Sequence, residues 1–193
     1  MNQINMSQIN IRLFDIILSL TGLICLLPVL TILFVVGLFD TGSPLFIQSR
    51  VGRHQKPFNL IKFRTMSVET KSVATHLACA SSVTKFGGFL RRTKLDELPQ
   101  LINVLFGQMS LVGPRPCLFN QVELIEEREK RRVFEVRPGI TGLGQINNVD
   151  MSTPRKLAKY DSALGNKVTA RHYLTCLLLT IYGKGQGDKI TKT

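Results

Sequence analysis

The sequence predicts a helix-rich α/β fold with small sheet elements, in which an apolar N-terminal helix is joined to one compact domain. The chain has 193 residues, a length typical of a single domain. Hydrophobic residues make up 44% of it and the mean hydropathy is +0.13, which excludes a disordered chain. Charged residues make up 20%, too many for a protein with several membrane spans. We therefore expect a membrane-associated segment at residues 1–40 and a basic domain at residues 41–193.

The N-terminal segment is long enough to enter a bilayer. From Ile16 to Phe39, 24 successive positions carry no charge, and as a helix they would reach about 36 Å, against a hydrocarbon core of ~30 Å. A cleaved signal peptide is not expected, because the run is too long and lacks a small-residue cleavage site. Pro28 divides the run into halves that cannot cross alone. Two readings remain open, a re-entrant hairpin broken at Pro28 and a kinked spanning helix.

Charge on the two sides of this segment is unequal. Arg12, accompanied by Asp15, is the one cation before it, whereas residues 50–95 carry ten Lys or Arg and one acid, Glu69. The positive-inside rule places this second flank in the cytoplasm. The four cysteines include no Cys-x-x-Cys pair, which argues against a zinc site and fits a reducing compartment.

The first part of the domain alternates turns with short regular elements. Residues 40–44 predict a turn that closes the anchor. Strands are expected at Leu45–Gln48 and Phe58–Phe63, around a basic loop, whereas residues 67–84 predict a loop or a weak helix. A helix is expected to begin with Asp96 as its N-cap and to stop at Gly107.

The second part is expected to contain two rigid loops and two helices. Residues 113–116 and 137–142 are rich in Gly and Pro and predict loops, the first of which presents Arg115. Residues 123–132 predict a charged, solvated helix with ion pairs four residues apart. The apolar stretch at residues 173–182 is too short to span a bilayer and predicts a core helix or an interfacial one.

Asp96 and Glu97 are the conspicuous acids in a chain of net charge +12. Adjacent carboxylates repel, but nearby cations such as Arg91 compensate this pair, and a helix N-terminus attracts phosphate. The pair could hold a Mg²⁺ ion together with substrate phosphates, leaving one carboxylate to react. In the alternative reading, Asp96 only caps its helix and Glu97 is ordinary first-turn charge. Arg115 suits either a phosphate or a structural ion pair.

Four strings of the sequence carry a resemblance to a known family. They are Lys62-Phe-Arg-Thr-Met66, the stretch from Lys94 to Leu105, Met109-Ser-Leu-Val-Gly-Pro-Arg-Pro116 and Val136-Arg-Pro-Gly-Ile-Thr-Gly142. Their order resembles that of the bacterial sugar transferase family, and in particular its small monotopic phosphoglycosyl transferases. The resemblance covers about residues 10–180.

The resemblance implies a reaction and its partners. Members transfer a sugar 1-phosphate from a UDP-sugar to undecaprenyl phosphate and release UMP, as the first membrane step of glycoconjugate assembly. The implied cofactor is Mg²⁺, and the anchor of the family is a re-entrant helix broken at a proline. The implied location is the bacterial inner membrane with the active site on the cytoplasmic face. Membrane lipids would be partners, nucleic acid would not, and a homodimer is compatible with this picture.

The resemblance also implies roles for individual residues. Asp96 would be the nucleophile that forms a phosphosugar ester, and Glu97 would help to hold Mg²⁺ or handle the proton. Arg91 is included as a binding residue because its positive charge lies close to the acidic pair in the sequence. The six residues expected to bind the phosphates or the nucleotide are Lys62, Arg64, Arg91, Arg115, Arg137 and Asp161.

The sequence also departs from the family pattern. Leu27 stands where many members have a Ser before the proline, and Gly142-Leu-Gly-Gln145 replaces the usual Gly-Trp-Ala-Gln. The second change falls in the part expected to contact the sugar, so the donor sugar is not taken from common members. A function of another class is also open, namely a membrane-tethered basic module that binds anions or lipids without catalysis.

Overall fold

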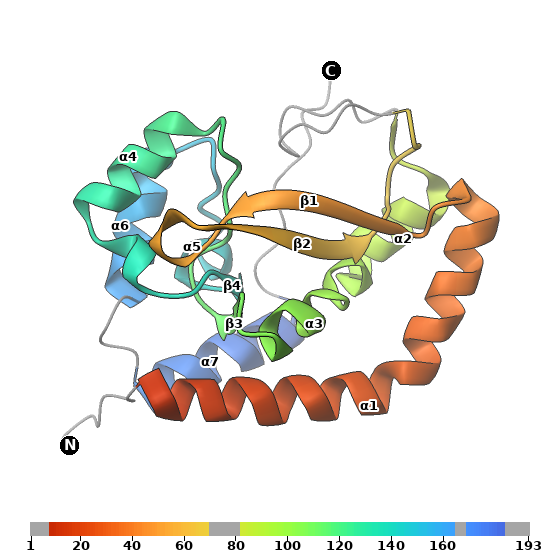
Figure 1. Cartoon of the computed structure of the whole chain (residues 1–193), viewed down its shortest axis with the longest axis horizontal. Coiled ribbons are helices and arrows are strands. Elements are labelled where there is room, and N and C mark those ends of the chain that lie inside the picture. Colours follow the sequence, from red (N-terminus) through yellow and green to blue (C-terminus); the bar gives the residue numbers. More distant parts are fainter. Residues whose placement is uncertain (1–7, 70–81, 165–168, 184–193) are drawn as a thin grey trace.

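The computed structural model describes residues 8–69, 82–164 and 169–183. Its helices are α1 (Gln8–Thr41), α2 (Lys85–Thr93), α3 (Gln100–Leu105), α4 (Val122–Lys130), α5 (Leu143–Ile146), α6 (Pro154–Leu164) and α7 (Ala170–Ile181). Short 3-10 turns are η1 (Arg53–Gln55), η4 (Leu95–Glu97) and η5 (Val133–Glu135). The strands are β1 (Leu45–Val51), β2 (Pro57–Phe63), β3 (Ser110–Val112) and β4 (Gly139–Thr141). The predicted helix-rich chain with small sheets is thus confirmed (Figure 1).

Helix α1 contains the whole predicted apolar run and bends within it. Figure 1 shows two arms that meet at a sharp bend near the middle of the helix. Pro28 lies inside the helix, where it cannot donate a hydrogen bond to the carbonyl of Ile24. The Thr31 hydroxyl donates to the Leu27 carbonyl at 2.9 Å, a kind of bond that bends helices. The chain therefore turns at the proline without leaving the helix.

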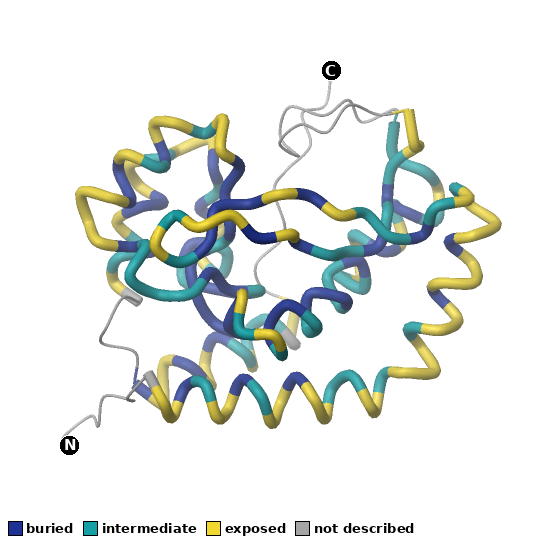
Figure 2. Tube along the Cα trace, in the orientation of Figure 1, coloured by how far each residue is buried: buried dark blue, intermediate teal, exposed yellow. Residues whose placement is uncertain are grey.

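Both arms of α1 pack on the domain along their inner side. In the first arm, a Cβ added to Gly22 would lie 3.3 Å from Cδ1 of Leu101 in α3. In the second arm, Leu33 is buried together with Phe63 of β2 and Leu90 of α2. Most of the outer side is exposed (Figure 2). Residues 9–41 form a helix that is long and apolar enough to cross a membrane, with a mean hydropathy of 2.7 in its most apolar part.

Strands β1 and β2 form the predicted hairpin and extend slightly further than expected. They pair in antiparallel register, so that Phe46 lies opposite Lys62 and Arg50 lies opposite Phe58. The intervening basic loop contains η1, and Gly42 at φ 69° ends the turn after α1. Beyond β2, Met66 forms an isolated bridge with Val83. The expectation of a loop or weak helix at 67–84 falls largely on residues 70–81, which lie outside the described residues.

The helix predicted to begin at Asp96 is displaced, and the N-cap prediction is wrong. Lys94 adopts a left-handed conformation, φ 59°, which closes α2 and starts η4. Asp96 therefore lies inside a 3-10 turn, and α3 begins only at Gln100 after Pro99. Gly107, at φ +79°, follows the end of α3 as predicted.

The two Gly/Pro-rich loops meet in a small parallel sheet that the sequence did not predict. Strand β3 pairs with β4, so residues 139–141 are a strand and not the expected loop. Gly113 donates its N–H to the Thr141 carbonyl, and Gly139 donates to the Pro114 carbonyl, each at 2.8 Å. A Cβ on Gly139 would lie 2.0 Å from the nitrogen of Gly113. The loops therefore pack backbone against backbone, which only glycine permits.

Helices α4 and α7 differ from their predictions. Of the two predicted ion pairs, Glu127–Arg131 is present, whereas Lys130 pairs with Glu127 and not with Glu126 as expected. Arg128 in α4 is 1% exposed, so this helix is not fully solvated. Helix α7 packs Tyr173 and Cys176 into the core, as the first alternative expects, and its Leu174 side is exposed; an interfacial position stays a prediction.

Candidate functional site

Asp96 is buried among charged side chains. Its residue is only 8% exposed, although it sits in a short turn between two helices. Burial raises the pKa of the Asp96 carboxyl to about 6, and the neighbouring charge of Glu97 acts in the same direction. Three cations act against this rise in pKa and so favour the ionised form of the carboxyl near neutral pH: Lys62, Arg91 and Arg115. A poised carboxylate of this kind is a candidate nucleophile or base.

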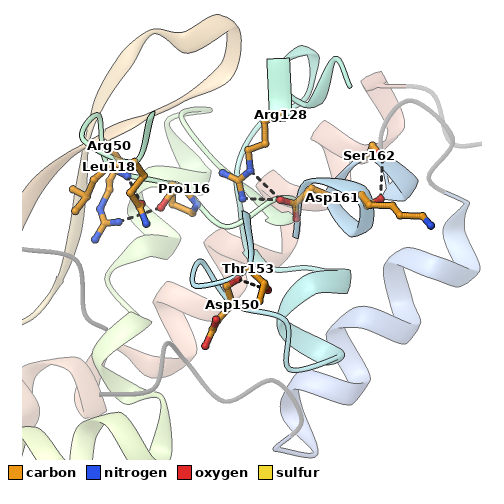
Figure 3. Close-up of polar contacts among 10 residues, drawn as sticks. Arg50, Pro116, Leu118, Arg128, Asp150, Thr153, Asp161 and Ser162 are labelled. Atoms are coloured by element: carbon orange, nitrogen blue, oxygen red, sulfur yellow. Dashed lines mark hydrogen bonds and ion pairs between the residues drawn. The ribbon is translucent and has the colours of Figure 1, made fainter. Parts of the chain in front are cut away.

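Glu97 is held beside Asp96 by Arg115. Nη2 of Arg115 lies 2.9 Å from Oε1 of Glu97, and both side chains are partly exposed. Arg115 comes from the rigid Gly113–Pro116 loop, as the sequence predicted. This loop is fixed from the other side by Arg50, which donates from Nη1 to the Pro116 carbonyl at 3.2 Å (Figure 3).

Lys62 reaches the site from β2. Burial lowers the pKa of its ammonium group to about 8, while the charge of Asp96 works against this shift. Its Nζ lies 5.4 Å from the ring centroid of Phe46, the residue opposite it in the hairpin. An ammonium with a pKa near 8 can change its protonation state close to physiological pH. The site thus combines a carboxyl and an amine whose pKa values approach each other.

Arg91 is positioned by close packing between α2 and the end of β2. Its Nε donates to Oγ1 of Thr65 at 2.8 Å. Gly87 permits this approach, since a Cβ there would lie 2.1 Å from the Thr65 carbonyl oxygen. The structure therefore brings Lys62, Arg91 and Arg115 around the acidic pair, as the sequence led us to expect.

The other residues predicted to bind substrate are held by groups other than the acidic pair, although the guanidinium of Arg64 lies 5.4 Å from the same Phe46 ring as Nζ of Lys62. Arg64 donates to the Ser43 carbonyl at 2.8 Å and so ties the end of β2 to the turn after α1. Arg137 donates from Nε to the Gly107 carbonyl at 2.9 Å, near the end of α3. Burial lowers the pKa of Arg137, and the charges of Arg53 and Arg12 add to this effect. The assignment of Arg64 and Arg137 to phosphate binding stays a prediction.

Asp161 is part of a buried ion pair. Nε and Nη2 of Arg128 donate to its Oδ2 at 2.9 and 2.7 Å, and both side chains are 2% exposed (Figure 3). This pair joins α4 to α6. A stabilising role is thus visible for Asp161, whereas its role in substrate binding stays a prediction. The partner, Arg128, was missed because its 33-residue separation from Asp161 gives no local signal.

Asp96 and Glu97 are compatible with a magnesium ion completed by a substrate. In the described part of the chain, no three His, Cys, Asp or Glu side chains come together in a metal-binding group. Mg²⁺, however, is commonly held by one or two carboxylates, waters and substrate phosphates. The adjacent carboxylates and the surrounding cations fit such a shared site, although Oε1 of Glu97 would have to exchange Arg115 for the metal.

Comparison with known proteins identifies the family of this chain. Residues 6–184 match the bacterial sugar transferase family, and the chain belongs to that family. This places it in a class of transferases, and the resemblance seen in its four sequence strings is confirmed.

Three relatives illustrate the range of the family. The sugar transferase EpsL of Bacillus subtilis is 46% identical over 137 residues, which cover 70% of this chain and 67% of EpsL. The exopolysaccharide production protein PSS of Rhizobium leguminosarum is 40% identical over 157 residues, 75% of this chain and 76% of PSS. The UDP-glucose:undecaprenyl-phosphate glucose-1-phosphate transferase of Escherichia coli is 47% identical over 143 residues, 70% of this chain. That match covers 30% of the longer E. coli protein.

Proposed function

We propose that this protein is a phosphoglycosyl transferase that moves a sugar 1-phosphate from a UDP-sugar to undecaprenyl phosphate and releases UMP. The observation that carries the proposal is the buried Asp96, whose raised pKa is balanced by Lys62, Arg91 and Arg115. Relatives named as undecaprenyl-phosphate sugar transferases support it, because they match most of this chain. The product would enter the assembly of a polysaccharide or another glycoconjugate.

In the first half of the proposed reaction, a carboxylate oxygen of Asp96 attacks the β-phosphorus of the UDP-sugar. A bond forms between that oxygen and the β-phosphorus, the bond from the β-phosphorus to the bridging oxygen breaks, and UMP leaves with that oxygen and the electron pair. Lys62, Arg91 and Arg115 would offset the negative charge that gathers on the phosphate oxygens. The phosphosugar then remains on Asp96 as an acyl phosphate ester.

In the second half, a phosphate oxygen of the lipid acceptor attacks the same phosphorus. The ester bond to Asp96 breaks, the carboxylate is regenerated, and a lipid diphosphosugar is released. Two steps keep the two anionic substrates from occupying the site at once, which reduces the repulsion between their phosphates.

The proposed cofactor is Mg²⁺, held by oxygens of Asp96 and Glu97 together with the diphosphate of the donor. When bound, it would neutralise phosphate charge and favour departure of UMP. Glu97 would meanwhile orient Arg115 until the donor arrives.

We place the active site on the cytoplasmic face of the bacterial inner membrane. Two observations support this: the many cations that follow α1, and the packing of both arms of α1 against the same domain. In this arrangement α1 is re-entrant, enters the bilayer at its bend and returns to the same face. The anchor would then hold Asp96 at the level where the acceptor phosphate lies.

The proposal is tested by incubating the purified full-length protein with Mg²⁺, undecaprenyl phosphate and a panel of UDP-sugars, and by measuring UMP. UMP release with one donor, and a phosphosugar adduct on Asp96 detected by mass spectrometry, are the expected results. An active enzyme that never forms the adduct with its true donor would overturn the nucleophile assignment. A protein that binds anionic vesicles but releases no UMP with any donor would point to the non-catalytic basic module.

A further inference from the structure

Two polar side chains on the first arm of α1 point into the domain. Asp15 is fully buried, at 0% exposure, and Arg12 lies one helical turn before it with partial burial. Both belong to the helix at residues 9–41 that is apolar enough to enter a membrane. Ionisable residues in such helices are costly and are usually retained for a function. Neither residue contributes to the pKa of Asp96, so they lie outside the charged cluster of the site.

Asp15 links the arm to two other elements through one oxygen. Its Oδ1 accepts hydrogen bonds from Oγ of Ser110 at 3.0 Å, from the backbone N–H of Leu111 at 2.9 Å and from the Tyr173 hydroxyl at 2.7 Å. Its Oδ2 is buried without a hydrogen-bond partner among the described residues. The buried, unpaired Oδ2 is unfavourable for folding, whereas the three hydrogen bonds to Oδ1 offset that cost. The same three bonds fix the arm in one register against β3 and α7.

Arg12 links the same arm to the end of α3. Its two terminal nitrogens donate to the carbonyls of Val104 and Leu105, at 2.5 and 2.7 Å. These are among the last carbonyls of α3, where a cation is favoured by the helix dipole. The arm is thus held at the far end of a short helix that begins three residues after Glu97.

Helix α3 transmits this position to the site because it is also fixed to β2. Oδ1 of Asn103 accepts from the N–H of Ile61 at 3.0 Å, and its Nδ2 donates to the Asn59 carbonyl at 2.7 Å. Ile61 directly precedes Lys62 in the sequence. Hydrogen bonds therefore tie the first arm of α1 to α3, and α3 to β2. The acidic pair shortly precedes α3 in the chain, and Lys62 lies in β2.

We propose that Arg12 and Asp15 form a polar dock that sets the height and orientation of the Asp96 site relative to the bilayer. They act as positioning residues, because they touch neither substrate nor reacting atoms. This proposal rests on the proposed function, and it concerns the lipid-dependent half of that reaction. The soluble UDP-sugar can reach the site from water, whereas the phosphate of the lipid acceptor is confined to the headgroup layer. Loss of the dock should therefore impair transfer to the lipid much more than formation of the adduct.

The test compares Asp15→Leu with the conservative variant Asp15→Asn in the full-length protein, reconstituted in phosphatidylethanolamine/phosphatidylglycerol vesicles. Asn keeps a carbonyl oxygen for the three donors, whereas Leu removes it. For Asp15→Leu we expect UMP release without acceptor within about twofold of the parent, and turnover with undecaprenyl phosphate lowered about ten- to a hundredfold. Asp15→Asn should restore most of that turnover. Equal loss of both half-reactions in Asp15→Leu, or loss of neither, would overturn the proposal.

A second measurement does not depend on activity. The chain has no tryptophan, so a Phe106→Trp substitution at the exposed end of α3 gives a single fluorescent probe. Quenching by lipids brominated at different depths reports the depth of this probe in the vesicles. We expect Asp15→Leu to shift the quenching profile and Asp15→Asn to leave it unchanged. An unshifted profile in Asp15→Leu would overturn the dock, whereas failure of the proposed function would appear as absence of UMP release in the parent protein.

Discussion

At the scale of single residues, the environment of Asp96 is unfavourable for its charge. The folded protein raises the pKa of this carboxyl from its ordinary value to about 6, mainly by burial. A group of this kind stabilises the fold while it is protonated and loses that contribution as the pH rises through 6. At pH 8 the ionised Asp96 therefore lowers the free energy of unfolding of the wild-type chain, and this destabilisation largely disappears near pH 4. Such a loss of stability is typical of a residue kept for its reactivity.

We predict that Asp96→Asn abolishes UMP release without destabilising the protein. Asn resembles the neutral form of the carboxyl, so at pH 8 the variant should gain up to roughly 3 kcal/mol, and this gain should disappear as the pH approaches 4. Thermal unfolding in detergent at both pH values and a UMP assay would measure the two effects. Glu129→Gln on the exposed side of α4 is the control and should change neither. Near-normal turnover of Asp96→Asn would refute its role as nucleophile.

The pH dependence of kcat/KM should reflect both titratable groups of the site. Below pH 6 Asp96, the proposed nucleophile, is protonated, and the rate should fall about tenfold per pH unit. Above pH 8 Lys62 loses the charge that assists phosphate binding, so a decline on the alkaline side is also expected. Because Lys62 favours the carboxylate, Lys62→Met should move the acidic limb to higher pH. An acidic limb at unchanged pH would show that Lys62 does not influence the ionisation of Asp96.

Asp161 gives a prediction of a different kind, since it forms a buried ion pair. Burial raises the pKa of the Asp161 carboxyl, but its partner Arg128 is equally buried, so Asp161→Asn would leave a fully buried guanidinium without its carboxylate. This should lower stability by about 3–5 kcal/mol. Glu123→Gln, which breaks the exposed pair with Arg155, should cost less than about 1 kcal/mol. Thermal unfolding of both variants measures this difference. A raised KM for the UDP-sugar at unchanged stability would instead support substrate binding by Asp161.

The sequence predicted the residues of the candidate site more readily than the residues that hold the surrounding elements in place. Asp96, Glu97, Lys62, Arg91 and Arg115 belong to short strings whose charges are evident along the chain, and the structure brings them together. The roles of Asp15, Arg50 and Arg128 depend on partners 33 to 158 residues away. Such contacts are set by tertiary packing and leave no periodic or local signal.

At the scale of elements, the glycines of the loops at residues 113–116 and 137–142 determine where Arg115 lies. The hairpin β1–β2 was predictable from its apolar runs and flanking turns, whereas β3 and β4 have three residues each and pair in parallel across an intervening helix. The predicted start of α3 at Asp96 was wrong because the backbone conformation of single residues sets this boundary. The left-handed Lys94 begins a 3-10 turn, and α3 starts only after Pro99.

We predict that Gly139→Ala disrupts the contact between these loops. The added Cβ would lie 2.0 Å from the nitrogen of Gly113, so the backbone must move, at a cost of about 3 kcal/mol or more. Gly88→Ala in α2 is the matched control, because its Cβ would meet nothing within 4 Å and Ala favours a helix by about 0.5–1 kcal/mol. Thermal unfolding compares the two variants. Equal melting temperatures for both would contradict the close packing of the loops.

At the scale of the whole molecule, the bend in α1 brings both of its arms against the same domain. The sequence indicated an interrupted apolar helix but left a hairpin and a kinked span open. In the structure the first arm is bonded to α3 and β3 through Arg12 and Asp15, and the second arm is packed on β2 and α2. Two arms that hold the same domain cannot also lie on opposite sides of a bilayer without breaking one set of contacts.

We therefore predict that the N-terminus lies on the same side of the membrane as the domain. A tag placed before Met1 should resist protease added to intact spheroplasts and should be digested after lysis, like a control tag placed after Thr193. Pro28→Leu should favour a straight helix of about 50 Å, which can reach across the bilayer. The N-terminal tag of this variant should become accessible from outside, and its turnover should fall because the dock at Asp15 is lost. Digestion of the wild-type N-terminal tag in intact spheroplasts would instead require a spanning helix and a domain held by its second arm alone.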